Sequence, residues 1–155
     1  MTAWVFKTEP EEFSIDDLQR VQVEPWTGIR NYQARNSLRD VAKPGDTVYL
    51  YHSSCAVPAL VGVAEIATST YPDPLQFKPD SDYFDPGAKP EEPRWLCLDL
   101  RYRRHLKRAI PLTELKQHAA DLEDLLLLKR GNRLSVFPIS RTHETYLLAL
   151  EKTSP

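Results

Sequence analysis

The chain is organised around one stretch in its first quarter, Trp26-Thr27-Gly28-Ile29-Arg30-Asn31-Tyr32-Gln33-Ala34-Arg35-Asn36, which Leu38 and Arg39 complete. From Pro25 to Arg39 there are three arginines, two asparagines, one glutamine and two large aromatic residues, and no carboxylate. Guanidinium groups suit phosphates, side-chain amides suit base edges, and aromatic rings offer stacking faces. The stretch therefore fits two interpretations, and one of them is part of a nucleic-acid site. A capped helix that follows a core tryptophan is the alternative interpretation.

Hydrophobic spacing predicts an amphipathic helix over residues 31–41. Ala34, Leu38 and Val41 fall on one helical face, and polar or aromatic side chains fall on another. The first turn of such a helix has free backbone N–H groups, so its N-terminus at Arg30 and Asn31 is a candidate anion site.

The rest of the chain predicts a mixed set of short elements. Alternating β-forming residues indicate strands over 3–8, 47–52, 60–66, 95–103 and 134–139. Capping residues and leucine spacing indicate helices over 14–20, from 110, over 121–128 and from 140. Gly62 and Ala64 leave one strand face nearly bare, which allows a neighbouring element or a ligand to approach closely. Thirteen prolines against five glycines indicate many fixed turns.

Length and charge limit the possible functions. With 155 residues, the chain is expected to form one domain over 1–155. The formal net charge of -2 excludes binding through bulk positive charge, so any nucleic-acid contact must be local. The two cysteines are far apart and the first residues lack a signal pattern. We therefore expect a soluble cytoplasmic protein with reduced thiols and no membrane partner.

Two further segments are unusual in composition. The segment from Tyr71 to Pro93 is rich in proline and aspartate, and its aromatic residues favour a packed loop over disorder. The run from Arg101 to Arg108 is strongly positive. We interpret it as a solvated strand end that prevents edge pairing, with a phosphate-contacting patch as the alternative.

An ordered set of short motifs gives the chain a family resemblance. The motifs are Trp4 to Pro10, Ser14 to Leu18, Trp26 to Leu38, Tyr51 to Cys55, Val61 to Glu65, Tyr71 to Pro74, Pro93 to Trp95 and Arg133 to Val136. Together they resemble the EVE domain family over nearly the whole chain. One difference is that Ser54 stands where the family commonly has asparagine.

This resemblance implies an α+β fold of the PUA-like type, a small mixed β-barrel flanked by short helices. It also implies binding of a modified base in DNA or RNA, of the 5-methylcytosine or 5-hydroxymethylcytosine type. A flipped base is expected to stack on Trp26 while polar groups contact its edge. The expected base-binding residues are Lys7, Thr8, Glu9, Trp26, Gly28, Ile29, Arg30, Asn31, Tyr32, Gln33, Tyr51, His52, Ser53 and Ser54. Arg30, Arg35 and Arg39 are expected to contact phosphates.

Two other functions compete with this hypothesis. His52 beside Ser53 and Cys55 fits a hydrolase or transferase acting on a nucleotide-like substrate, but adjacent strand residues point to opposite faces. We therefore predict no catalysis, no cofactor and no metal. The segment from Tyr71 to Pro93 could instead bind other proteins.

Overall fold

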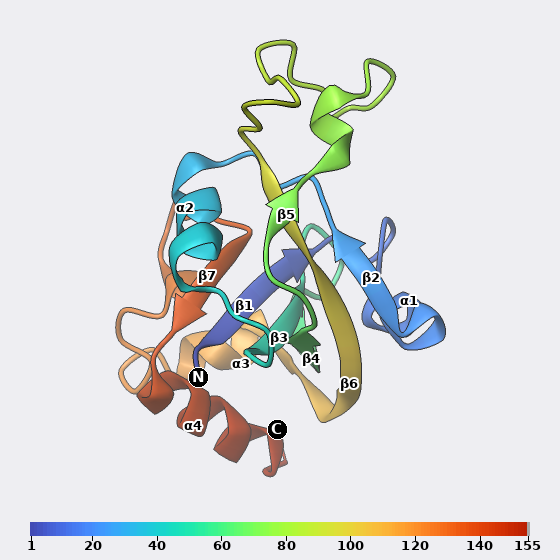
Figure 1. The fold of residues 1–155 in the computed structure, drawn as a ribbon. Coiled ribbons are helices and arrows are strands. Elements are labelled where there is room, and N and C mark those ends of the chain that lie inside the picture. The colour runs from blue at the N-terminus through green and yellow to red at the C-terminus, as the bar shows by residue number, and fades with distance from the viewer. Residues whose placement is uncertain (155) are drawn as a thin grey trace.

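The computed structural model describes residues 1–154, which form a mixed sheet with helices on both sides (Figure 1). The seven strands run in the order β2-β6-β4-β3-β1-β7, with β5 beside β6. β1 and β3 are parallel, and the other neighbouring strands among residues 1–154 are antiparallel. The strands are β1 (Ala3–Thr8), β2 (Val23–Trp26), β3 (Thr47–His52), β4 (Ala59–Ile66), β5 (Tyr71–Pro72), β6 (Leu96–Pro111) and β7 (Val136–Ile139).

Residues 1–154 also form four α-helices and two short 3-10 helices. They are α1 (Ile15–Val21), α2 (Tyr32–Val41), η1 (Pro74–Phe77), α3 (Leu112–Gln117), η2 (Leu126–Leu128) and α4 (Arg141–Glu151). The mixed sheet and short helices confirm the α+β class. Within residues 1–154, no helix is both long and apolar enough to cross a bilayer. The single domain and the cytoplasmic location stay predictions.

Successive residues of the inner strands face two different cores. In β1, Trp4 and Phe6 contact the core that α1 and α2 cover, whereas Val5 belongs to the core that α3 and α4 cover. β1 pairs with β3 and β7, so each face of the strand is buried. Any site on β1 must therefore lie at its end, where Lys7 and Thr8 are partly exposed.

The bare strand face at Gly62 is filled by protein. A Cβ atom on Gly62 would lie 2.3 Å from Cδ1 of Ile15, the first residue of α1. The small residue therefore admits a neighbouring helix. Ser14 caps that helix through a reciprocal capping box with Asp17.

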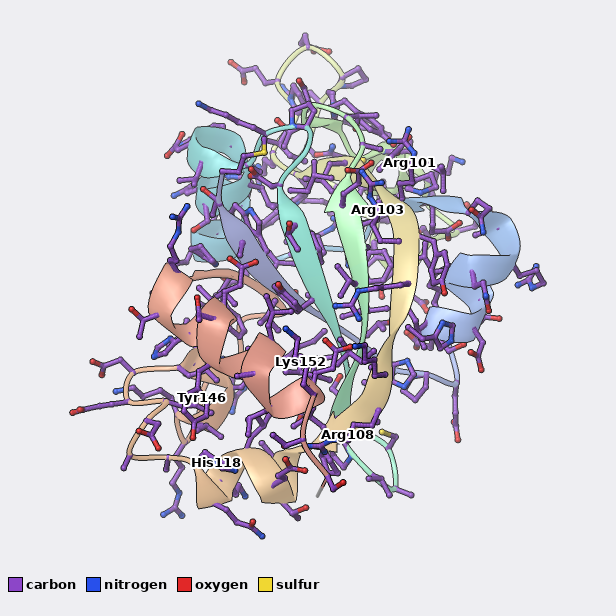
Figure 2. All side chains as sticks on the ribbon, turned by 90° about the horizontal axis from the view of Figure 1, so that it is seen from below. Arg101, Arg103, Arg108, His118, Tyr146 and Lys152 are labelled. Carbon is purple, nitrogen blue, oxygen red and sulfur yellow. The ribbon has the colours of Figure 1, made fainter. Side chains whose placement is uncertain are left out.

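The predicted strand over 95–103 was too short. β6 continues to Pro111, so the positive run lies within a strand instead of at its end. Its alternating arginines meet carboxylates from other elements: Arg101 and Arg103 pair with Glu65, Arg104 with Glu151, and Arg108 with Glu114. Figure 2 shows Arg101 and Arg103 at one end of β6 and Arg108 towards the other. These four arginines of β6 are therefore paired with carboxylates of β4, α3 and α4.

Two further element predictions were wrong. The helix expected over 121–128 is a series of turns followed by η2, because Asp124 has a positive φ of 70° that an α-helix cannot contain. Its leucines Leu122 and Leu125 are nevertheless buried. The strand β2 was missed because it is short and contains Pro25. That proline is tolerated because β2 is an edge strand.

Candidate nucleic-acid interface

A cavity of about 370 Å³ opens where three chain segments meet. The segments are the end of β1 with the turn after it, the end of β2 with its connection to α2, and the segment before β7. Ser53 and Tyr83 complete the lining. We call this the base cavity. It is lined by Lys7, Thr8, Glu9, Glu12, Phe13, Glu24, Pro25, Trp26, Thr27, Gly28, Ile29, Ser53, Tyr83, Arg133, Leu134 and Ser135.

The apolar part of the base cavity is built on Trp26. This residue ends β2 and is only 9% exposed, so most of its ring belongs to the core. Phe13 meets it edge-on at 5.8 Å between ring centroids, and Phe6 lies 6.2 Å away. The Trp26 ring is therefore a core residue that also lines the cavity, and its stacking on a base stays a prediction.

Gly28 forms the rim of the base cavity and is covered by an aromatic ring. Its φ of +86° is favourable only for glycine, and a Cβ atom there would lie 2.8 Å from Cζ of Tyr83. Tyr83 comes from the long segment between β5 and β6, far away in sequence. That segment therefore contributes a wall to the base cavity.

Asp73 holds this rim in place. Its carboxylate is fully buried, accepts a hydrogen bond from the Gly28 amide at 2.8 Å and another from the Leu75 amide at 2.8 Å. It also accepts one from Arg30 at 2.9 Å. Arg30 donates in addition to the carbonyl oxygen of Tyr83, at 3.1 Å from Nε and 2.9 Å from Nη2. The Arg30 guanidinium thus joins the two sides of the rim.

The polar lining of the base cavity is mainly acidic. Three glutamates, Glu9, Glu12 and Glu24, face one lysine and one arginine across it. Burial raises the pKa of Glu24 above its usual value. Burial also lowers the pKa of Lys7 below its usual value. With three carboxylates against two cations, the lining disfavours an anionic ligand.

The end of β3 contributes less than the sequence suggested. Ser53 lines the base cavity, and its amide donates to the Thr8 carbonyl oxygen at 2.9 Å. His52 instead accepts a hydrogen bond at Nε2 from the Ile15 amide at 3.1 Å, and burial lowers the pKa of its imidazole. Tyr51 is buried in the opposite core, and Ser54 is exposed in a left-handed conformation. The structure therefore does not bring Tyr51, His52 or Ser54 to the cavity.

The first turn of α2 lies beside the base cavity and not in it. Asn31 caps the helix, because its side-chain oxygen accepts from the Ala34 amide at 3.0 Å. Asn31 and Gln33 line a second hollow of about 460 Å³, together with Leu126 and residues 129–134. This second hollow shares Arg133 and Leu134 with the base cavity. The two hollows therefore adjoin.

The other polar side chains of α2 contact neighbouring groups of the protein. Tyr32 stacks on Trp95 with 4.7 Å between ring centroids. The Arg35 guanidinium bonds to the side chain of Asn36 and to the backbone carbonyl of Arg94. Arg39, in the last turn, pairs with its neighbour Asp40 at 2.9 Å. Their assignment as phosphate contacts stays a prediction.

Sequence reasoning missed several residues of the base cavity. Phe13 and Glu24 lie next to segments that the sequence predicted for the site. Arg133 to Ser135 belong to one of the family motifs, so the sequence did indicate these regions. Tyr83 gave no local signal, because only the folded path of its loop brings it to Gly28.

Comparisons with known proteins agree on one family. The family model described as the EVE domain matches residues 2–150. Mouse thymocyte nuclear protein 1 is 39% identical over 98% of this chain and 74% of its own length. A crystal structure of human THYN1 protein in complex with 5-methylcytosine-containing DNA is 36% identical, with a TM-score of 0.95 and full coverage of both chains. A crystal structure from Pseudomonas syringae is 44% identical, with a TM-score of 0.91 and coverage of 96% and 99%.

Proposed function

Because the chain belongs to the EVE domain family, we propose that it is a non-catalytic reader of a modified base in DNA or RNA. The modification is of the 5-methylcytosine or 5-hydroxymethylcytosine type. The observation that carries this proposal is the base cavity between β1, β2 and β7. It is supported by the human relative of the same fold, which was crystallised with DNA containing 5-methylcytosine.

The size and lining of the base cavity suit a single flipped base. Its volume of about 370 Å³ lies near the lower end of the range for small-molecule sites, roughly 300–1,000 Å³. The edge of cytosine carries an exocyclic amino group, for which carboxylates are the matching acceptors. Glu24 and its neighbours Glu9 and Glu12 offer such acceptors. Hydroxyls of Thr27 and Ser53 can donate to the ring nitrogen and carbonyl oxygen.

The apolar side of the base cavity accounts for sensitivity to a methyl group. Trp26, Phe13 and Leu134 form a surface against which a 5-methyl group is removed from water. Burying one such group contributes about 0.8 kcal/mol, which corresponds to roughly fourfold tighter binding. A 5-hydroxymethyl group needs a hydrogen-bond partner as well, because an unpaired buried hydroxyl is unfavourable.

The contacts of His52 argue against the hydrolase or transferase alternative. The Nε2 lone pair of His52 accepts from the Ile15 amide, so it is not available as a base for Ser53 or Cys55. Within residues 1–154, no hydrogen bond links His52 to either of those side chains. The neighbouring serine therefore has no activating partner.

The proposal is tested by binding measurements on matched oligonucleotides. Strands carrying cytosine, 5-methylcytosine, 5-hydroxymethylcytosine or N6-methyladenine at one position, as DNA and as RNA, are titrated by fluorescence anisotropy at one defined salt concentration. We expect tighter binding to a modified cytosine than to cytosine. Equal affinity for all four strands in both backbones contradicts the proposal.

Two glutamate variants assign the recognition to the base cavity. Glu24→Gln keeps the shape of the cavity but replaces one carboxylate oxygen by a donor, so it should weaken binding to the modified cytosine and reduce discrimination. Glu11→Gln is the matched control, since Glu11 is exposed and lies outside the cavity lining. Equal affinities of the two variants for every strand contradict a base-edge role for Glu24.

A further inference from the structure

A groove beside the base cavity has the opposite electrostatic character. It is the hollow of about 460 Å³ lined by Asn31, Gln33, Leu126 and residues 129–134, and we call it the α2 groove. Figure 1 shows the segment that leads into β7 running beside α2. The α2 groove adjoins the base cavity through Arg133 and Leu134, which line both. A strand whose base occupies the cavity has the groove next to it.

The lining of the α2 groove contains cations and no carboxylate. Lys129, Arg130 and Arg133 are its charged members. Lys129 pairs with Asp124 at 3.1 Å, but both side chains are more than half exposed, so the pair is weak and easily exchanged. Within residues 1–154, Arg130 and Arg133 form no ion pair. The groove therefore offers two uncompensated guanidinium groups and a third available cation.

The arginines of α2 differ from these cations. Arg30 is bonded to the buried Asp73, and Arg35 to Asn36 and a backbone carbonyl. Arg39 has an aspartate partner beside it. A phosphate that contacts these groups must compete with protein acceptors, whereas one in the α2 groove meets Arg130 and Arg133 directly.

The turn at the edge of the α2 groove contains an unused donor. The Asn132 amide donates to the Lys129 carbonyl oxygen at 3.3 Å, and Gly131 adopts a φ of +79° at the bend. The side-chain oxygen of Asn132 accepts from the Leu134 amide at 3.2 Å. Its Nδ2 group is buried and has no hydrogen-bond partner among the described residues. This donor is closed to a ligand, so contacts with phosphate in the α2 groove must come from its cations.

We propose that the α2 groove binds the phosphodiester backbone that flanks the read base, with Lys129, Arg130 and Arg133 contacting phosphate oxygens. This inference rests on the proposed function and adds the path of the strand to it. The three glutamates of the base cavity repel phosphate, and the cations of the α2 groove attract it. The two hollows therefore divide the ligand, because one takes an uncharged base and the other takes its charged backbone.

Phosphate contacts have a measurable signature. They strengthen binding to modified and unmodified strands alike, and they make the logarithm of the association constant fall with the logarithm of salt concentration. The slope changes by about 0.7 for each phosphate contact on a single strand and about 0.9 on duplex DNA. Loss of two contacts should reduce its magnitude by about 1.4 to 1.8.

The test compares two double variants that each remove two positive charges. Lys129→Gln/Arg130→Gln alters the α2 groove, and Arg20→Gln/Lys116→Gln removes two exposed cations from α1 and α3. A 5-methylcytosine oligonucleotide and its unmodified counterpart are titrated over a series of salt concentrations. We expect a smaller slope and weaker binding only for the groove variant, with the preference for the modified strand unchanged.

The possible outcomes separate the groove from the proposed function. A groove variant with the wild-type slope, or equal slope losses in both double variants, overturns the groove proposal even where the wild type prefers the modified strand. If the wild type shows no preference for the modified strand but the salt slope falls in the groove variant alone, the proposed base-reading function is refuted and the groove proposal stands.

Discussion

Replacing Asp73 gives the most direct test of how the rim of the base cavity is held together. The Asp73 carboxylate is fully buried and accepts three hydrogen bonds, from the amides of Gly28 and Leu75 and from Arg30. Asp73→Ala leaves two backbone donors unpaired and a guanidinium, 20% exposed, without its anion. Removing one partner of a buried ion pair typically costs about 3–5 kcal/mol. We expect the free energy of unfolding to fall by that amount.

The isosteric variant Asp73→Asn has a smaller expected effect that also follows from the geometry. One carboxylate oxygen accepts from Gly28 and Arg30, and the other accepts from Leu75. An asparagine side chain can keep its oxygen towards Gly28 and Arg30, but its NH₂ group then faces the Leu75 amide. An unsatisfied buried donor costs about 1–3 kcal/mol, which is the expected loss.

Urea denaturation followed by tryptophan fluorescence measures these losses. Asp40→Asn is the control, because Asp40 is an exposed aspartate that also pairs with an arginine, and it should change the free energy of unfolding by less than about 0.5 kcal/mol. Combining Asp73→Asn with Arg30→Met should cost less than the sum of the single changes, since the arginine is then absent. Additive losses, or an Asp73→Asn protein as stable as the Asp40→Asn control, would refute the reasoning.

Two further predictions concern α1 and its contacts. His52→Ala removes the acceptor of the Ile15 amide and should lower the free energy of unfolding by about 1–3 kcal/mol at pH 8, with oligonucleotide binding unchanged in anisotropy titrations. Burial lowers the folded-state pKa of His52 below the usual 6.5. The stabilisation by His52 is therefore present above pH 6.5 and is lost as the pH falls through the folded-state pKa. If the difference in free energy of unfolding between the wild type and His52→Ala grows on acidification, this reasoning is wrong. Gly62→Ala should destabilise the protein by about 1–3 kcal/mol, because the new Cβ overlaps Ile15 Cδ1. The double variant Gly62→Ala/Ile15→Val, which lacks that methyl group, should lose less than the two single variants combined; additive losses in urea denaturation count against a steric cause.

The fold could be predicted where the local sequence pattern and the long-range packing favour the same element. Strand β1 has side chains that alternate between two cores, and α2 has both a capping residue and an apolar face. The predicted bounds, 3–8 and 31–41, therefore agree with the observed bounds to within about one residue. Strand β2 has only four residues and contains Pro25, and its position depends on pairing with β6. Such pairing is invisible to local periodicity. The extent of β6 depends likewise on carboxylates supplied by distant segments.

The site could be predicted at the level of segments but not of side chains. The sequence indicated that residues 7–9, 26–33 and 51–54 converge; Lys7, Trp26 and Ser53 line one cavity, whereas residues 30–33 lie outside its lining. It could not show that His52 points to α1, because the partner is a backbone amide 37 residues away. Tyr83 was missed for the same reason, since its place on Gly28 depends on the path of the long segment after β5.

The electrostatics of the two hollows explain how a chain with a net charge of -2 can hold nucleic acid. The arginine-rich look of residues 26–39 arises from side chains that bond to Asp73, Asn36 and Asp40. These three arginines line neither hollow. In the α2 groove, by contrast, Arg130 and Arg133 form no ion pair among residues 1–154. Because the base cavity holds three carboxylates and the α2 groove holds none, a ligand with an uncharged base beside a charged backbone suits both hollows.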